Sequence, residues 1–498
     1  MRRLYCALVA INLLWLASCG TTSTTPMVSL SPGLPQTLEQ GTALDVKAAV
    51  SNDPSNKGVT WSLTPVLGSL SNQTSTSVIY QAPDSVTTNA VVTITATSVA
   101  NSGEATPLVI SVLAPGEQNV QPISVNGGPL PGRLYLNGPF TSVVICAAGT
   151  SQCQSIDGIL VDTGSVGLRL FKSLLTVPLK PVTQSGGSVN NCISFVGQQF
   201  LWGEVASADV YLAGETASGI SVQLIADPTS FAIPTSCSNG DVDADSQEVF
   251  GANGLLGVGD EPTDCTFSGA NPCNLGATGA APPAYFVCFD GEGCAATQMP
   301  IAQQVMNPIA AFPRDNNGSI LQFPSVGTAM STANGTMTFG INTEPNNSLG
   351  TATVFAISSQ NNFTTVFSGQ QLTNSFIDSG SNMFFFPNIT GLQLCSDSPF
   401  YCPANPPVAL SATNEGANSL GSGPVDFQVD SFDSDTQSNP NDAAFGYVAG
   451  PNGTSPCQNG KGACSFDWGL PFFYNRSVFT SIDLQTVANE PKTPWWAY

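Results

Sequence analysis

Histidine is missing from all 498 residues of the chain. This absence excludes Ser-His-Asp and Cys-His catalysis, histidine proton relays and histidine metal sites. Any acid–base chemistry near neutral or acid pH must therefore depend on carboxyl groups.

Basic residues are scarce, with 12 Lys and Arg against 34 Asp and Glu, giving a formal net charge of -22. This balance excludes nucleic acids and anionic surfaces as partners. It also means that little positive charge accumulates when the carboxylates are protonated, so we expect tolerance of acid pH. Only 9% of residues are charged, while the 48 Gly and the alternation of Thr, Val, Ile and Phe with polar residues predict a mostly β chain.

No apolar run is long enough to span a bilayer. The N-terminal stretch MRRLYCALVAINLLWLASCG instead indicates a secretory signal over residues 1–18. Its end, Leu16-Ala17-Ser18-Cys19, resembles a bacterial lipobox, which implies that Cys19 becomes the lipidated first residue. We therefore expect a lipoprotein of the bacterial cell envelope whose lipid is its only membrane anchor. By analogy, Gly20 favours the outer membrane, with the protein periplasmic or surface-exposed.

The CxxC spacing typical of metal thiolates is also missing, so we expect neither a metal site nor a cofactor. Of the 14 cysteines, Cys6 lies in the signal and Cys19 carries the lipid. The even number that remains predicts disulfide bonds in an exported protein. Sequence alone does not fix the connectivity. The pairing that proximity favours is Cys146–Cys153, Cys192–Cys237, Cys265–Cys273, Cys288–Cys294, Cys395–Cys402 and Cys457–Cys464.

Three regions follow the signal. Residues 19–27 form a polar tether, and residues 28–114 contain strand-like runs separated by turn residues, such as GVTWSLTP at 58–65. This second region resembles the bacterial Ig-like domains of surface proteins, which implies a β-sandwich. We expect it to act as a spacer, although a ligand-binding or adhesive role stays open. Residues 115–125 are a plausible linker to a long, glycine-rich, mostly β region over residues 126–498.

Two copies of one short pattern stand out in this last region. ILVDTGSVGLRLF at 159–171 and SFIDSGSNMFFFP at 375–387 each interrupt an apolar run with Asp-Thr/Ser-Gly-Ser. One copy is a weak signal, because Asp-x-Gly commonly marks a turn. Two copies, each preceded by a strand-like run, predict a pair of carboxyl groups. Adjacent carboxyls cannot both ionise, so they share a proton and can activate water without histidine or metal.

The residues around the two acids have expected roles. Asp162 and Asp378 would be the catalytic pair, and Gly164 and Gly380 would let the backbone turn tightly beside them. The hydroxyl side chains would donate supporting hydrogen bonds. They are Thr163, Ser165, Ser379 and Ser381.

These motifs resemble those of the pepsin-like aspartic proteases, in which each of two lobes contributes one Asp-Thr/Ser-Gly motif. NGLLGVGD at 253–260 is similar to the segment behind the first aspartate, and NGTMTFGIN at 334–342 to the strand that closes the first lobe. DWGLPFFYNRSVFTSID at 467–483 resembles the penultimate segment of the second lobe, although Asp467-Trp468-Gly469 is an imperfect copy. The region also resembles a set of bacterial secreted domains of unassigned function. The resemblance implies lobes of roughly 126–343 and 344–498 and hydrolysis of a peptide or protein substrate at acidic pH.

One segment departs from the pepsin-like pattern. Residues 192–214 fall where those enzymes carry a flap hairpin with a Tyr-Gly tip, but this chain has Phe195, Val196 and Gly197 there. The flap tyrosine is therefore absent or replaced by Phe195, which lacks the hydroxyl. An ordinary strand role for Phe195 is equally open.

Other functions remain compatible with the sequence. The two aspartates could cap turns in a catalytically inactive binding or surface-adhesion lipoprotein with the same fold. A glycosidase also uses two carboxyls, but that reaction does not need the Asp-Ser/Thr-Gly-Ser setting. The sequence carries no information on the oligomeric state.

Overall fold

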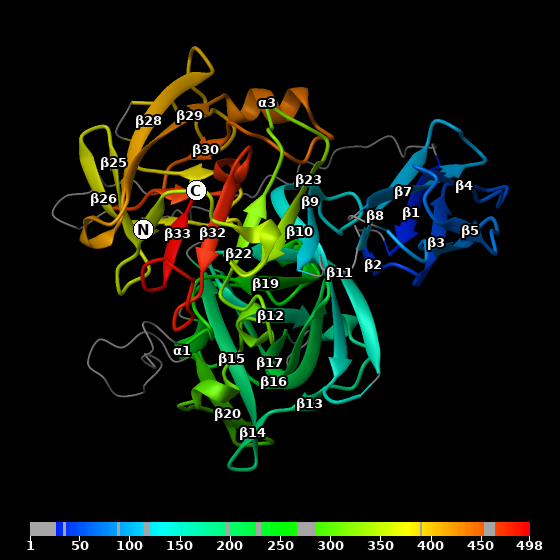
Figure 1. The fold of residues 1–498 in the computed structure, drawn as a ribbon, viewed down its shortest axis with the longest axis horizontal. Helices are drawn as coiled ribbons and strands as arrows, with labels where there is room; N and C mark the ends of the chain where they lie inside the picture. Colours follow the sequence, from blue (N-terminus) through cyan, green and yellow to red (C-terminus); the bar gives the residue numbers. More distant parts are fainter. Residues whose placement is uncertain are drawn as a thin grey trace, which may run out of the picture.

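The computed structural model describes residues 26–498 apart from 33–35, 87–89, 114–118, 151, 196–198, 226–230, 239, 266–283, 389–390 and 453–463. Within these residues the chain is mostly β, as predicted. Strands β1–β8 form a small unit beside a much larger body (Figure 1). No helix in the described part of the chain is long and apolar enough to cross a bilayer.

The small unit consists of two four-stranded sheets. One has the order β1 (Met27–Ser31), β3 (Ala43–Ser51), β6 (Ser77–Gln81), β5 (Ser69–Ser71); the other has β2 (Gln36–Glu39), β8 (Ala105–Leu113), β7 (Ala90–Ser98), β4 (Val59–Thr64). Every second residue of these strands is apolar, so each sheet has one apolar face. Val46 and Tyr80 of the first sheet and Ile94 and Ile110 of the second lie in one buried cluster. The unit is therefore a β-sandwich.

The larger body begins one strand earlier than the sequence indicated. β9 (Val120–Gly127) pairs with β10 (Tyr135–Ala147) and with β23 (Ala333–Phe339). Part of the expected linker, residues 115–125, is thus a strand of the body, because Ile123 and Val125 are buried in its core.

The first lobe contains β10 and the elements that follow it up to β23. They are β11 (Cys153–Asp162), β12 (Val166–Phe171), β13 (Lys180–Pro181), β14 (Thr183–Gln184), β15 (Gly187–Phe195), β16 (Gln199–Leu212), β17 (Glu215–Ile225), α1 (Thr235–Ser238), β18 (Val242–Asp243), α2 (Gln247–Phe250), β19 (Gly254–Val258), β20 (Tyr285–Phe289), β21 (Gly293–Ala296) and β22 (Gly318–Gln322).

The second lobe is built on a seven-stranded sheet. Its order is β29 (Ser422–Val429), β28 (Val408–Glu415), β25 (Phe363–Phe367), β26 (Gln370–Ile377), β31 (Asp467–Trp468), β27 (Phe384–Phe385), β30 (Ala449–Gly450). Helix α3 (Phe432–Ser438) follows β29, and a 3-10 turn, η6 (Leu470–Phe473), follows β31.

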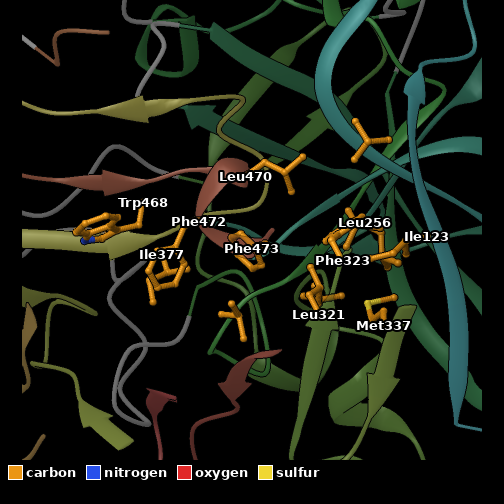
Figure 2. Close-up of a cluster of buried hydrophobic side chains, with 14 of the residues drawn as sticks. Ile123, Leu256, Leu321, Phe323, Met337, Ile377, Trp468, Leu470, Phe472 and Phe473 are labelled. Atoms are coloured by element: carbon orange, nitrogen blue, oxygen red, sulfur yellow. The ribbon is translucent and has the colours of Figure 1, made fainter. Parts of the chain in front are cut away.

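A run of six antiparallel strands joins the lobes. In spatial order they are β9, β23, β22, β32 (Ser477–Ser481), β33 (Trp495–Ala497) and β24 (Val354–Ala356). Strand β32, close to the end of the chain, therefore pairs directly with β22 of the first lobe. The core is continuous across this junction: Figure 2 shows Ile123 and Leu256 in the same apolar cluster as Ile377 and Trp468.

The core of the first lobe also holds a charged group. The Arg169 side chain on β12 is 0% exposed and forms an ion pair of 3.1 Å with Asp264. Its guanidinium also donates to Asn191 Oδ1 at 2.6 Å and to Gln223 Oε1 at 2.5 Å. The Asp264 carboxylate accepts from the Tyr285 hydroxyl at 2.5 Å. These residues lie on separate strands and loops, so the network ties the walls of the lobe together.

Four of the expected disulfide pairings are formed: Cys146–Cys153, Cys192–Cys237, Cys288–Cys294 and Cys395–Cys402. Three close hairpins or short loops, while Cys192–Cys237 ties β15 to α1. The expected pairs Cys265–Cys273 and Cys457–Cys464 each include a cysteine outside the described residues. The signal segment and Cys19 also lie outside the described residues.

Candidate active site

The two Asp-containing turns lie at matching places in the two lobes. Strand β11 ends at Asp162 and runs parallel to β19, with Asp162 opposite Gly257. Strand β26 ends just before Asp378 and runs parallel to β31, with Ile377 opposite Trp468. The segments at 253–260 and 467–483 thus lie behind the two aspartates.

The fold brings the two carboxyls together, and a hydrogen bond joins Asp162 and Asp378. The adjoining glycines leave the space for this contact. A Cβ atom at Gly164 would lie 2.5 Å from Asp378 Cγ, and one at Gly380 would lie 2.6 Å from Asp162 Oδ1. Any larger residue at either position would collide with the opposite carboxyl. The close approach of the two carboxyls therefore explains why both positions are glycine.

Each carboxyl receives the same two supporting hydrogen bonds. The backbone N–H of Gly164 donates to Asp162 Oδ1 at 2.8 Å, and Ser165 Oγ donates to Asp162 Oδ2 at 2.5 Å. In the second lobe, Gly380 N–H donates to Asp378 Oδ1 at 2.7 Å and Ser381 Oγ to Asp378 Oδ2 at 2.9 Å. The serines hold the outer oxygens, so the inner oxygens are left facing each other.

Thr163 and Ser379 bind the turns to each other. The backbone N–H of Ser379 donates to Thr163 Oγ1 at 2.9 Å, and that of Thr163 donates to Ser379 Oγ at 3.1 Å. Each hydroxyl then donates across to the other lobe, to Ile377 O at 3.4 Å and to Val161 O at 2.9 Å. Both side chains are buried, so this exchange fixes the spacing of the carboxyls.

We expect Thr163→Val to destabilise the protein by about 1–3 kcal/mol, because it leaves the buried N–H of Ser379 without its acceptor. Thr163→Ser, which copies the residue used in the second lobe, is the control and should cost less than about 1 kcal/mol. Denaturant unfolding of both variants measures the difference. Equal losses in the two variants would contradict this assignment, because the serine variant keeps the hydroxyl that the valine variant lacks.

Burial and the neighbouring charge of Asp378 raise the pKa of Asp162 well above its usual value, with burial the larger cause. The pair therefore keeps one proton over a wider pH range than an exposed aspartate would. Gly164 is exposed and Asp378 is partly exposed, so the pair is open to solvent on one side.

Two residues near the pair were not assigned a role from the sequence. Burial and then the charges of Asp162 and Asp378 raise the pKa of Tyr135 to about 12. Asp467, noted in the sequence only as part of an imperfect copy, is hydrogen-bonded to Ser381, with 2.7 Å between Asp467 Oδ2 and Ser381 Oγ. Neither belongs to a local motif, so only the strand pairings of β10 and β31 bring them to the site.

The expected flap segment forms a hairpin of β15 and β16, in which Phe195 pairs with Gln199. Val196 and Gly197 lie outside the described residues. The Phe195 ring packs at 6.5 Å from that of Phe250 and belongs to the same apolar cluster as Tyr135. Its role as a flap residue remains a prediction.

Among the described residues, Cys395, Cys402 and Asp433 are grouped closely enough to hold a metal ion. The two cysteines are bonded to each other, so they have no thiolate to offer.

Asp260, which follows β19, makes the stability of the protein depend on pH. Burial, and to a lesser extent the charge of Asp483, raises the pKa of Asp260 from 3.8 to about 7. The native state then holds a proton that the unfolded chain has already lost, so this contribution is complete below about pH 3.9 and is lost as pH rises through 7.

We therefore expect the folded state to lose about 3 kcal/mol from this group between pH 4.5 and 7.5. Thermal unfolding at the two pH values measures the change, and Asp260→Asn should reduce it. Stability that increases from pH 4.5 to 7.5, or an unchanged slope in the variant, would contradict this assignment.

Comparison with known proteins gives a family and a structural likeness. Residues 115–498 match the model of a family described as "Protein of unknown function (DUF3443)". Solved structures that resemble the chain include an aspartic proteinase from Irpex lacteus, at 14% sequence identity and a TM-score of 0.43 over 72% of this chain and 93% of that chain. No curated protein matches the sequence.

Proposed function

The chain belongs to the DUF3443 family, and we propose that it is an aspartic endopeptidase in which Asp162 and Asp378 activate water. The observation that carries the proposal is the hydrogen-bonded contact of the two carboxyls, each held by a glycine N–H and a serine hydroxyl. A pair of turn-capping aspartates would need no such contact across two lobes.

The proposed reaction uses one proton shared by the pair. The ionised carboxyl takes a proton from a water molecule, whose oxygen bonds to the peptide carbonyl carbon, while the protonated carboxyl gives its proton to the carbonyl oxygen. The tetrahedral intermediate then collapses. Its C–N bond breaks as the carboxyl that took the water proton gives that proton to the leaving nitrogen. The other carboxyl takes a proton from a hydroxyl of the intermediate, which becomes the carboxylic acid product, so the pair again holds one proton. The raised pKa of Asp162 favours this residue as the proton donor to the carbonyl.

The exposed backbone of Gly164 and the partly exposed side chain of Asp378 give a substrate access to the pair. The substrate class is a peptide or protein chain.

The test is digestion of an acid-denatured protein by the purified full-length chain from about pH 2.5 to 7. We expect fragments with an acidic optimum, because the reaction needs one proton on the pair. Cleavage should be inhibited by a peptide whose scissile amide is replaced by a secondary alcohol, which imitates the tetrahedral intermediate. A folded protein that cuts nothing at any pH would refute the proposal.

That negative result would favour the second candidate, a binding or surface-adhesion lipoprotein with an inactive cleft. The observation that supports this candidate is the lack of a tyrosine in the described part of the β15–β16 hairpin near its tip, where Phe195 packs beside Phe250. The candidate predicts that substitution of either aspartate leaves function unchanged.

We further propose that the chain is exported and held in the cell envelope, on the outer membrane, by a lipid on Cys19, with residues 28–114 as an Ig-like spacer. The signal segment and the two-sheet sandwich support this arrangement. Mass spectrometry of the mature N-terminus tests it, since a chain that begins after residue 19, or at Cys19 without added lipid mass, would exclude the anchor.

A further inference from the structure

A third carboxyl group lies directly behind the pair. The Asp467 side chain is buried on β31 and contacts Ser381, whose hydroxyl lies 2.9 Å from Asp378 Oδ2 and 2.7 Å from Asp467 Oδ2. Ser381 thus stands between two acids.

The number of protons available in this hydrogen-bonded contact limits the possible charge of Asp467. A serine hydroxyl has one proton to donate and two lone pairs to accept with. It cannot donate to two carboxylates at once, so one of the two acids must carry a proton and donate to Ser381. The other oxygen of Asp467, Oδ1, is buried and has no hydrogen-bond partner among the described residues. An ionised Asp467 would therefore be poorly satisfied, whereas a neutral one needs only this single bond.

The first lobe shows the same site without the third acid. Pairing of β11 with β19 puts Leu255 opposite Leu160, two residues before Asp162; pairing of β26 with β31 puts Asp467 opposite Phe376, two residues before Asp378. Leu255 is buried and apolar, and Ser165 has Asp162 as its one carboxyl partner. The two turns share the glycine and serine hydrogen bonds to their carboxyls but differ in this acid, which makes the pair asymmetric.

We propose that Asp467 is a neutral positioning residue that donates a proton to Ser381, which turns the Ser381 hydroxyl towards Asp378 and keeps Asp378 as the ionised member of the pair. This inference rests on the proposed function and assigns the two members of the pair different roles. A serine that accepts from an acid is a stronger donor in turn, because hydrogen bonds in a chain polarise one another.

The surroundings of Asp467 favour the neutral form. Burial is the main cause that raises its pKa, and the charges of Asp378 and Asp162 act in the same direction. The residues that pair with Asp467 from β26 and β27 are Phe376 and Phe385, which carry no charge. A Ser381 hydroxyl that donated to Asp467 would lower this pKa, but in the proposed arrangement that hydroxyl donates to Asp378 instead.

Two substitutions of Asp467 distinguish the effect of its hydrogen bond to Ser381 from the effect of its acidic group. Asp467→Leu copies Leu255 of the first lobe and removes the donor, whereas Asp467→Asn keeps a neutral group that can donate to Ser381. In the leucine variant we expect the acid limb of the kcat/KM profile to move up by about one pH unit, with about a tenfold loss of kcat/KM below pH 4, because the pair loses a hydrogen bond that supports its single negative charge. The asparagine variant should retain the parent's acid limb and most of its activity.

A second measurement does not depend on catalysis. Infrared difference spectra of the parent and Asp467→Asn at pH 6 should show one protonated carboxyl band that the variant lacks, because the other buried acids cancel. If the parent cleaves nothing, the proposed function fails, and the spectrum still decides whether Asp467 is neutral.

Three results would overturn the inference. They are the absence of the carboxyl band, an unshifted acid limb in a folded leucine variant, and an asparagine variant that behaves like the leucine one.

Discussion

Asp162→Asn and Asp378→Asn are each expected to reduce acid cleavage by at least about 1000-fold. Positioned acid–base groups contribute about 100- to 10,000-fold, and here each carboxyl acts in both steps of the proposed reaction. An asparagine cannot take a proton from water or return one to the substrate. In each turn the glycine N–H donates to one carboxyl oxygen and the serine hydroxyl donates to the other. An asparagine can accept from the glycine with its oxygen and donate to the serine with its NH2, so the turn stays in place while the shared proton is removed.

The measurement compares initial rates on a denatured protein at the parent's optimum. Asp84→Asn is the matched control, because this exposed aspartate lies in the sandwich and should leave the rate unchanged. Near-parent cleavage by either folded active-site variant would mean that the activity comes from another site. Because the two residues act as one unit, the double variant should lose little more than each single one.

Replacing Arg169 by methionine should destabilise the first lobe by about 3–5 kcal/mol. The substitution leaves Asp264 buried without its ion-pair partner, which is the costly way to break a buried pair. It also removes the donors to Asn191 and Gln223. Burial already raises the pKa of Asp264, and the Arg169 charge is the largest opposing cause, so in the variant Asp264 should become protonated more readily.

Denaturant unfolding measures the loss of stability, and two further variants show how much of it comes from the buried ion pair. Lys172→Met breaks an exposed ion pair with Glu204, of 3.2 Å, and should cost less than about 1 kcal/mol. The double variant Arg169→Met with Asp264→Asn should recover part of the loss, because no buried charge is left behind. If Arg169→Met were as mild as Lys172→Met, the buried network would contribute little to the stability of the lobe.

The site could be predicted from the sequence to the extent that it is local. Each Asp-Thr/Ser-Gly-Ser motif supplies its own turn, its own glycine N–H and its own serine donor, so the motif already contains most contacts of its carboxyl. The internal repetition of the motif then indicated that two such turns meet. Even the exchange between Thr163 and Ser379 follows from a pair of hydroxyl residues at equivalent positions.

Contacts that depend on the order of strands in a sheet could not be predicted from a local motif. Asp467 reaches Ser381 because β31 inserts between β26 and β27, and nothing near residue 467 specifies that neighbour. Arg169 lies in an apolar run and has its partners on β15 and β17 and in the segment that follows β19. The start of the larger body was also placed too late, because β9 lies next to a glycine- and proline-rich stretch whose composition favours a linker.

The six-strand junction between the lobes also dictates an order of folding. Strand β22 is complete at residue 322, but its partner β32 and the next strand β33 lie after nearly the whole second lobe. Until those segments arrive, β22 presents unpaired N–H and C=O groups on an apolar core, which is the kind of edge that recruits other chains. Pairings between such distant segments form slowly. A chain delivered from its N-terminus would thus carry this open edge from residue 322 until residue 481 has arrived, so the first lobe needs protection from aggregation during that interval.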